Sequence, residues 1–360
     1  MEQPMPVSPA IRVSQPGGRT AMSSSHQREV GRLVESLVRG AALELYLTPK
    51  PGLVDLADSG SHSDLSLSTM ERSIHSIADY LLELFRSLSC GERFEHQVAI
   101  AKRAERNMLQ ARGTNTHRGY LFLSGLLLIA HWHTRSPGER SLRVTITSLA
   151  DDFFNSYGGK STHGRQVRQR YRAGGIVREA LAGFPSLFVT ALPAFRSSME
   201  RCSCFRSASF AMLAQLMQAV EDTTTLHRGG PFALSRIRRD GRVLERIIST
   251  GGDYVSFLAG LNRIYILKGI TMGGVADLLG LSYGYLLFRN EITLADETAH
   301  IASGTVCHLD ELSPLIRTRP DSAAWFSGSP AAGLQYQVPP NSLYEEAIFE
   351  ALQAVRCTAW

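Results

Sequence analysis

Side chains that can do chemistry gather in five polar breaks of the sequence, at residues 48–64, 113–118, 162–175, 222–230 and 272–277. Each break combines glycine or proline with a charged or imidazole side chain. Carboxylates and imidazoles can move protons, and cations beside glycine-rich helix starts can bind phosphate. One such break alone has a structural explanation, because turns and helix caps need the same residues. Together the breaks predict where a site lies, since helical proteins usually build sites in such connections.

The segments between these breaks have the apolar spacing of helices. Val30 to Leu45 follows the i, i+3, i+4, i+7 pattern and ends before two prolines in the run 48–52. A second helix is predicted from Ser68, which has capping-box spacing to Glu71. Further helices are predicted at 94–110, through 120–130, and at 144–157, 162–172, 206–221, 231–248, 253–268 and 273–288. No segment alternates with period two for long, so the predicted fold is all-α.

Composition divides the chain into three parts. Residues 1–26 are rich in Pro, Ser and Gly without periodicity and predict a flexible leader. Residues 27–292 carry the helical patterns and predict a single multi-helix globular catalytic domain. Residues 293–360 mix Pro, Ser and Gly without a clear apolar face, apart from a last helical pattern at 343–355, and predict a C-terminal extension.

Overall composition excludes several classes of protein. Five cysteines at irregular spacing argue against a disulfide scaffold and for a reducing compartment. The start of the chain lacks the apolar core of a secretory signal, and the longest apolar run, 120–130, falls short of the roughly 20 residues that span a bilayer. We therefore expect a cytoplasmic protein without a membrane partner.

The formal charge of +5 and pI near 9.0 fit a polyanionic partner, although many proteins carry such a charge without functional meaning. A nucleic-acid partner is not expected, because the basic residues come with no recognisable binding module and no interleaved aromatics. Phosphorylated small molecules remain the favoured partners.

In sequence order, the five breaks resemble the motifs of the triphosphoribosyl-dephospho-CoA synthase family. The run TPKPGLVD at 48–55, followed by His62 and Asp64, is similar to that family's opening signature, and GTNTHRG at 113–119 resembles its G-x-N-T-H-K-G loop. THG at 162–164, YRAGG at 171–175, Glu179 and GFP at 183–185 also follow the family order. DTTTLHRGG at 222–230 and GGVADLL at 273–279 resemble the last two motifs.

The resemblance implies a pentosyltransferase. Members of the family move the triphosphoribosyl group of ATP onto the ribose 2′-hydroxyl of 3′-dephospho-CoA and release adenine. The product is the prosthetic-group precursor of malonate decarboxylase or citrate lyase, and a transferase then loads it on their acyl carrier protein. Breaking an N-glycosidic bond passes through an oxocarbenium-like centre, which needs flanking carboxylates, a proton donor for adenine and cations for the phosphates.

The matched motifs supply candidates for each of these needs. The predicted catalytic residues are Asp55, Asp64, Asp222, Asp277 and His117. Mg²⁺ is the expected cofactor, with Asp55, Asp64 and Asp222 as its candidate ligands because hard oxygen ligands suit that ion. The predicted substrate- and phosphate-binding residues are Lys50, His62, Asn115, Thr116, Arg118, His163, Gly164, Arg168, Tyr171, Glu179, Arg228, Gly229, Gly230, Gly273 and Gly274.

The sequence departs from the family pattern at several matched positions. Arg118 stands where lysine is usual, Thr224 where asparagine is, Thr271 and Met272 where Ser-Pro is, and Val275 where serine is. Two alternatives therefore stay open. One is another magnesium-dependent transferase or hydrolase acting on a nucleotide N-glycosidic bond. The other is a catalytically inactive relative that binds nucleotide or CoA.

Overall fold

Twelve α-helices and one short π-helix form the residues that the computed structural model describes, which are 24–112, 116–134, 138–157 and 163–293. The elements are α1 (Ser24–Tyr46), α2 (Leu67–Ser89), α3 (Phe94–Arg112), α4 (Arg118–His133), α5 (Glu139–Tyr157), α6 (His163–Tyr171), α7 (Gly175–Leu181), η1 (Ser186–Ala191), α8 (Leu192–Cys202), α9 (Phe205–Ala219), α10 (Thr223–Ser249), α11 (Tyr254–Lys268) and α12 (Gly273–Phe288). No strand occurs among these residues. The predicted all-α fold is confirmed.

Two helices with little polar surface form the centre of the molecule. α12 and α4 are buried along most of their length, as expected for helices that are apolar on all sides. α1 packs against α12 at close range: a Cβ built on Gly40 would lie 2.3 Å from the backbone nitrogen of Gly284. The two helices can approach this closely because both positions are glycine. One main hydrophobic core runs from α1 to α12.

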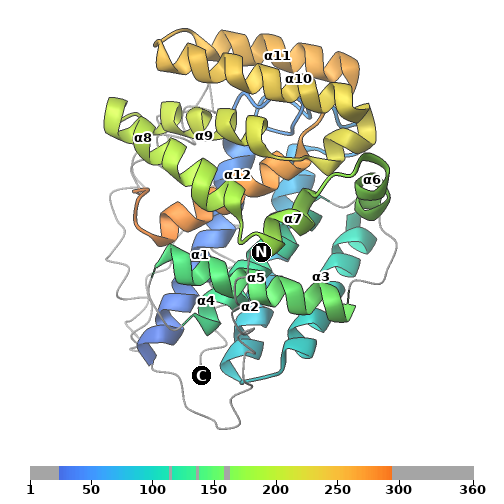
Figure 1. Cartoon of the computed structure of the whole chain (residues 1–360), viewed down its shortest axis with the longest axis vertical. Coiled ribbons are helices and arrows are strands. Elements are labelled where there is room, and N and C mark those ends of the chain that lie inside the picture. The colour runs from blue at the N-terminus through green and yellow to red at the C-terminus, as the bar shows by residue number, and fades with distance from the viewer. Residues whose placement is uncertain (1–23, 113–115, 135–137, 158–162, 294–360) are drawn as a thin grey trace, which may run out of the picture.

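The hairpin of α10 and α11 forms an outer layer over α9, at the top of Figure 1. α10 is kinked at Gly230, whose φ of 63° and ψ of −166° lie in a region that is essentially restricted to glycine. Pro231 follows directly and starts the second part of the helix, where its missing N–H costs nothing. The Gly-Gly-Pro run thus changes the direction of the helix axis between the N-terminal part of α10 and the remainder.

The structure differs from the sequence prediction in several elements. α7, η1 and α8 were not predicted, because the turn around Phe184 breaks the segment into pieces too short to show a helical period. α2 begins one residue earlier than predicted, and its cap is Ser66, which accepts from the Thr69 N–H at 3.3 Å, not Ser68. The N-terminal part of α10, residues 223–229, was not predicted, whereas the predicted start at 231 coincides with the second part of the helix, after the kink at Gly230.

The predicted leader and extension lie almost wholly outside the described residues, so the predicted division at 26 and 292 stays a prediction. No single described helix has the length and apolar character to cross a membrane. α7 together with η1 and α8 meets that criterion by length and composition, as a pair bent by 82°.

Candidate active site

The first motif folds into a loop that is fastened to the segment before α12. Gly52 has a φ of 70°, and a Cβ there would lie 2.2 Å from the Ile270 carbonyl oxygen, so the position requires glycine. The Gly52 N–H donates to Asn262 Oδ1 at 2.8 Å, and Ser61 Oγ donates to the Ile270 carbonyl at 2.6 Å. His62 Nε2 lies 2.9 Å from Thr271 Oγ1. The loop therefore reaches residues some 210 positions further along the chain.

Asp55 holds this loop in shape from within. Its carboxylate accepts the backbone N–H groups of Lys50 at 2.7 Å, Ala57 at 2.8 Å and Asp58 at 3.2 Å. The side chain is buried, and burial raises its pKa although the Lys50 charge and these hydrogen bonds act the other way. Asp55 thus organises the loop and does not line the pocket described below.

The second and last motifs meet at the N-terminus of α4. A Cβ on Gly119 would lie 1.9 Å from Asp277 Oδ2, so the glycine makes room for that carboxyl group. The Tyr120 N–H is hydrogen-bonded to Asp277. At the helix N-cap, His117 Nδ1 lies 2.7 Å from Ser73 Oγ, which also bonds Thr116 Oγ1. The free N–H groups of a helix N-terminus suit the carboxyl group of Asp277.

Asp222 joins the fourth motif to the last. It caps α10 through Oδ1, which accepts the N–H groups of Thr224 at 2.8 Å and Thr225 at 2.9 Å. Its Oδ2 accepts the Val275 N–H of α12 at 3.0 Å. Because the residue is 1% exposed and both oxygens are occupied, its evident role is to bind the starts of two helices together.

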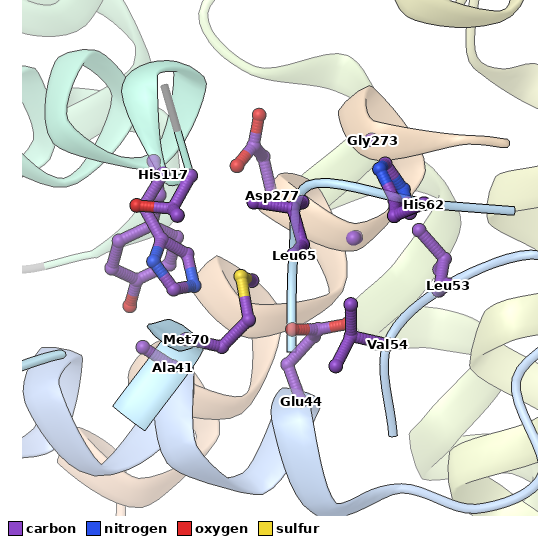
Figure 2. A pocket seen from close by; sticks show the side chains of 14 residues that line it. Ala41, Glu44, Leu53, Val54, His62, Leu65, Met70, His117, Gly273 and Asp277 are labelled. Atoms are coloured by element: carbon purple, nitrogen blue, oxygen red, sulfur yellow. The ribbon is translucent and has the colours of Figure 1, made fainter. Parts of the chain in front are cut away.

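These contacts build a cavity of about 60 Å³ between α1, α4, α12 and the loop (Figure 2). In this view Asp277 lies between His117 on one side and His62 on the other, with Glu44 of α1 below. The lining residues are Ala41, Glu44, Leu53, Val54, His62, Leu65, Met70, Thr116, His117, Tyr120, Gly273, Ala276, Asp277 and Gly280. Five predicted site residues are therefore brought together here: His62, Thr116, His117, Gly273 and Asp277.

Two groups in the cavity have shifted pKa values, and each shift favours the uncharged form of the group. The surrounding protein, and then the carboxylates of Asp222 and Glu44, raise the pKa of Asp277 well above its ordinary value. Burial, and then the charge of Arg228, lowers the pKa of His62, while Asp64 acts the other way. The cavity therefore favours a protonated Asp277 beside a neutral His62, which is an arrangement for acid–base chemistry.

The cationic part of the site lies at the rim. Arg228 is exposed and donates to the Ser61 carbonyl at 2.9 Å, which brings the fourth motif to the first. Two residues later Gly230 makes the kink, and a Cβ there would lie 3.8 Å from the Tyr171 hydroxyl. Gly274 packs on Asp222, where a Cβ would lie 3.1 Å from Oδ2. Arg118 pairs with Glu105 at 2.7 Å and is 40% exposed.

Several other predicted residues lie apart from the cavity. Lys50 is fully buried and pairs with Glu44 at 2.7 Å, and Glu179 accepts the Ser186 N–H at 3.1 Å in the turn after α7. Asp64 is half-exposed, 3.9 Å from His62 Nδ1. Asn115 lies outside the described residues, and of His163, Gly164 and Arg168 the structure describes the α6 backbone alone.

The carboxylates predicted to bind magnesium do not come together as ligands. Asp55 and Asp222 use their oxygens on backbone N–H groups, and Asp64 lies at the surface beside His62. Among the described residues, no group of three or more His, Cys, Asp or Glu side chains could hold a metal ion. The three carboxylates therefore do not form a shared metal-binding cluster in the described residues, and the Mg²⁺ cofactor stays a prediction.

Glu44 is the main residue that sequence reasoning missed. Its signal was present, because it lies on the apolar stripe of α1 three residues after Ala41, where a charged side chain is unusual. Asn262, which holds Gly52 and donates to Asp58 Oδ2 at 2.8 Å, gave no comparable signal.

Comparison with known proteins decides the family. A family model described as ATP:dephospho-CoA triphosphoribosyl transferase matches residues 31–292, which include all of the cavity. The chain belongs to this family. The suspected resemblance and the expected class of enzyme, a transferase, are thereby confirmed. The matched region also coincides with the helices from α1 to α12 that build the site.

Curated relatives agree with this assignment. The chain is 32% identical over 282 residues, 73% of its length and 92% of the relative's, to a probable 2-(5''-triphosphoribosyl)-3'-dephosphocoenzyme-A synthase of Stutzerimonas stutzeri. Probable synthases of the same name from Salmonella choleraesuis and Pseudomonas aeruginosa are each 30% identical, over 70% and 72% of this chain and 89% and 91% of theirs. No solved structure matches the chain.

Proposed function

We propose that this protein transfers the 5-triphosphoribosyl group of ATP to the 2′-hydroxyl of 3′-dephospho-CoA and releases adenine. The observation that carries the proposal is the cavity itself, in which His62, His117 and Asp277 come from three different family motifs. The relatives' printed names supply the two substrates. Membership of the family alone would not say where on this chain the reaction occurs.

In the proposed reaction the bond between C1′ of the ATP ribose and the adenine nitrogen breaks, and a bond from C1′ to the 2′-oxygen of dephospho-CoA forms. Asp277 donates its proton to the leaving adenine, since its raised pKa favours the protonated form. His62 accepts the proton of the attacking hydroxyl, since its lowered pKa keeps it neutral. This assignment reverses the one suggested by residue types, in which a carboxylate was the base and an imidazole the acid.

Charge decides which part of ATP enters the cavity. Glu44, which is paired with Lys50, makes its wall acidic, which suits the positive charge that develops on the ribose and repels phosphate. We place the triphosphate outside, near the exposed Arg228 and the glycine-rich start of α12. Mg²⁺ then arrives as part of the ATP substrate, bound to its phosphates.

For the pathway we favour malonate decarboxylase over citrate lyase, because the runs GFP at 183–185 and LHRGG at 226–230 resemble that branch of the family. The product would pass to a holo-acyl-carrier-protein synthase or transferase, and the setting would be the cytoplasm.

The test is to incubate the purified protein with ATP, Mg²⁺ and dephospho-CoA and to measure free adenine and the mass of the CoA product. We expect both to form together, and adenine to require dephospho-CoA. Adenine released without the new CoA species would replace the proposal with a hydrolase. Binding of either substrate without any reaction would leave an inactive relative as the better account.

A further inference from the structure

Lys50 is the lysine of the first motif, yet it has no direct path to a substrate. The side chain is 0% exposed. Its ammonium group donates to Glu44 Oε1 at 2.7 Å, to the Leu45 carbonyl at 3.3 Å and to the Glu44 carbonyl. These bonds use all three donors of the ammonium group. Lys50 also lies at the C-terminal end of α1, where a positive charge is favourable.

Glu44 connects this lysine to the cavity. Its side chain bonds Lys50 and at the same time lines the cavity wall. It is 5% exposed, and burial raises its pKa, while the charge and the hydrogen bond of Lys50 act the other way and favour the ionised form. Across the helix contact, a Cβ on Gly280 would lie 3.4 Å from Glu44 Cβ, and Gly280 is one turn beyond Asp277 on α12.

The groups that face Asp277 come from every element around it. They are Glu44 of α1, His117 and Tyr120 of α4, Asp222 at the start of α10 and His62 of the loop. Two carboxyl groups that share one small cavity resist ionising together. Lys50 contacts Glu44, and the described contacts give Asp277 no cation of its own. The lysine therefore decides that the negative charge lies on Glu44 and the proton on Asp277.

We propose that Lys50 and Glu44 form a positioning pair that acts on the reaction through Asp277, an inference that rests on the function proposed above. Neither residue needs to touch the reacting atoms. Lys50 keeps Glu44 ionised and in place, and the ionised Glu44 keeps the Asp277 proton available for adenine.

The first readout is the pH–rate profile of Glu44→Gln, which keeps the shape of the side chain but removes its charge. Asp277 then loses its proton more easily, so we expect the alkaline limb of kcat to move down by about 1 pH unit or more. The position of the limb on the pH axis is the readout, because removing the Glu44 charge from the cavity wall also lowers the rate itself. Glu71→Gln is the matched control, because Glu71 is also buried, accepts from Tyr46 Oη at 2.8 Å and does not line the cavity. It should leave the limb in place.

A double-variant cycle tests the role of Lys50. Glu44→Gln leaves a buried ammonium without its counter-charge, so this variant is expected to be less stable, and Glu44→Gln with Lys50→Met should recover stability. If Lys50 acts through Glu44, adding Lys50→Met to Glu44→Gln moves the alkaline limb no further. An additional shift of similar size would overturn the pair and make Lys50 an independent contributor.

The second readout needs no substrate. The melting temperatures of Asp277→Asn and its parent are compared across pH, in the original chain and in the Glu44→Gln chain. The two curves separate above the unfolded-state pKa of the carboxyl group, and the pH at which their difference stops growing reports the folded-state pKa of Asp277. That pH should fall by about 1 unit in the Glu44→Gln chain. If it does not move, the pair is rejected even if the synthase reaction is found. If it moves and no synthase product forms, the pair is supported and the proposed function is rejected.

Discussion

At the scale of single residues, the cavity works by holding two titratable groups in forms they would not favour in water. Asp277 is surrounded by protein and faces two further carboxylates, while His62 has the charge of Arg228 nearby. A protonated carboxyl group can donate a proton, and a neutral imidazole can accept one. The substrates would meet both in one small space.

Asp277→Asn should abolish turnover and stabilise the protein. Loss of a general acid lowers kcat by about 10²–10⁴-fold. Because the folded-state pKa of Asp277 is raised, its contribution to stability is complete at pH values below its unfolded pKa and is lost as pH rises through the folded pKa. The variant should therefore melt higher than the parent at pH 8, by about 2–4 °C for each kcal/mol, with no difference at acid pH.

Thermal unfolding at several pH values and the adenine assay measure both effects. The exposed Asp151→Asn of α5 is the control and should change neither. An Asp277→Asn protein with near-parental kcat would remove the acid role.

Arg228→Ala should weaken ATP binding more than it slows the reaction. The side chain is exposed at the rim, where a charge-assisted bond to phosphate contributes about 1.5 kcal/mol, or roughly tenfold in affinity. We expect KM for ATP to rise about tenfold with kcat little changed. Arg242→Ala, also exposed on α10, should leave KM unaltered. Equal effects of the two substitutions would mean that Arg228 acts through general surface charge.

At this scale the sequence identified residue types better than residue roles. Asp277 and His62 were recognised because they lie in breaks that resemble the family's motifs and follow them in sequence order. Asp55 and Lys50 were recognised too, but their partners are backbone groups and Glu44, which no spacing along the chain reveals. Glu44 was overlooked because it lies within a regular helix, outside the five breaks, although a charged residue on the apolar stripe of that helix was a signal.

At the scale of elements, the site depends on how helix starts are tied together. One carboxylate, Asp222, accepts backbone N–H groups at the N-termini of both α10 and α12. It thereby fixes the position of Asp277, which lies one turn further along α12. The rest of the wall comes from the start of α4, where Gly119 leaves space for the same carboxyl group. Helix ends, which expose unpaired N–H groups, are thus the parts that define the cavity.

Asp222→Asn should reduce stability and activity together. The amide keeps one acceptor for the α10 cap but turns an NH₂ group toward the Val275 N–H, so one buried donor loses its partner at a cost of about 1–3 kcal/mol. The α12 start, and with it Asp277, should shift. Urea unfolding and the adenine assay would measure this. Asp253→Asn changes the exposed cap of α11, which binds Ser256 N–H at 3.0 Å, and should be nearly neutral because asparagine caps equally well.

Comparable stabilities for the two cap variants would show that Asp222 is an ordinary cap.

The sequence predicted most of these helices because their apolar periods are long. It missed the N-terminal part of α10, before Gly230, and the short pieces α7 and η1, where the conformation is set by contacts with other elements and by single backbone angles.

At the scale of the whole molecule, the cavity joins residues from nearly the full described length, from Ala41 to Gly280. What brings them together is the close crossing of α1 and α12. Such a contact between distant segments has no signature in local sequence patterns, which explains why the set of cavity residues could not be predicted even though the all-α class could.

Gly40→Ala should therefore damage the site without touching it. The new methyl group would meet the Gly284 backbone at 2.3 Å and push the two helices apart, with a cost of about 1–3 kcal/mol and a loss of activity as Glu44 and Asp277 separate. Gly260→Ala in α11 is the control: its nearest neighbour would lie 3.9 Å away, and the helix should gain about 0.5–1 kcal/mol. Full activity in Gly40→Ala would contradict this dependence on the crossing.

The enclosure of Lys50 has a consequence for chemical labelling. The chain contains just four lysines, at 50, 102, 160 and 268, so each modified peptide can be assigned without ambiguity. An amine-reactive acylating reagent cannot reach an ammonium group that is 0% exposed. Acylation of Lys50 would then require the 48–64 loop to open, and its rate, followed by mass spectrometry with and without ATP, would report how often that loop leaves the cavity.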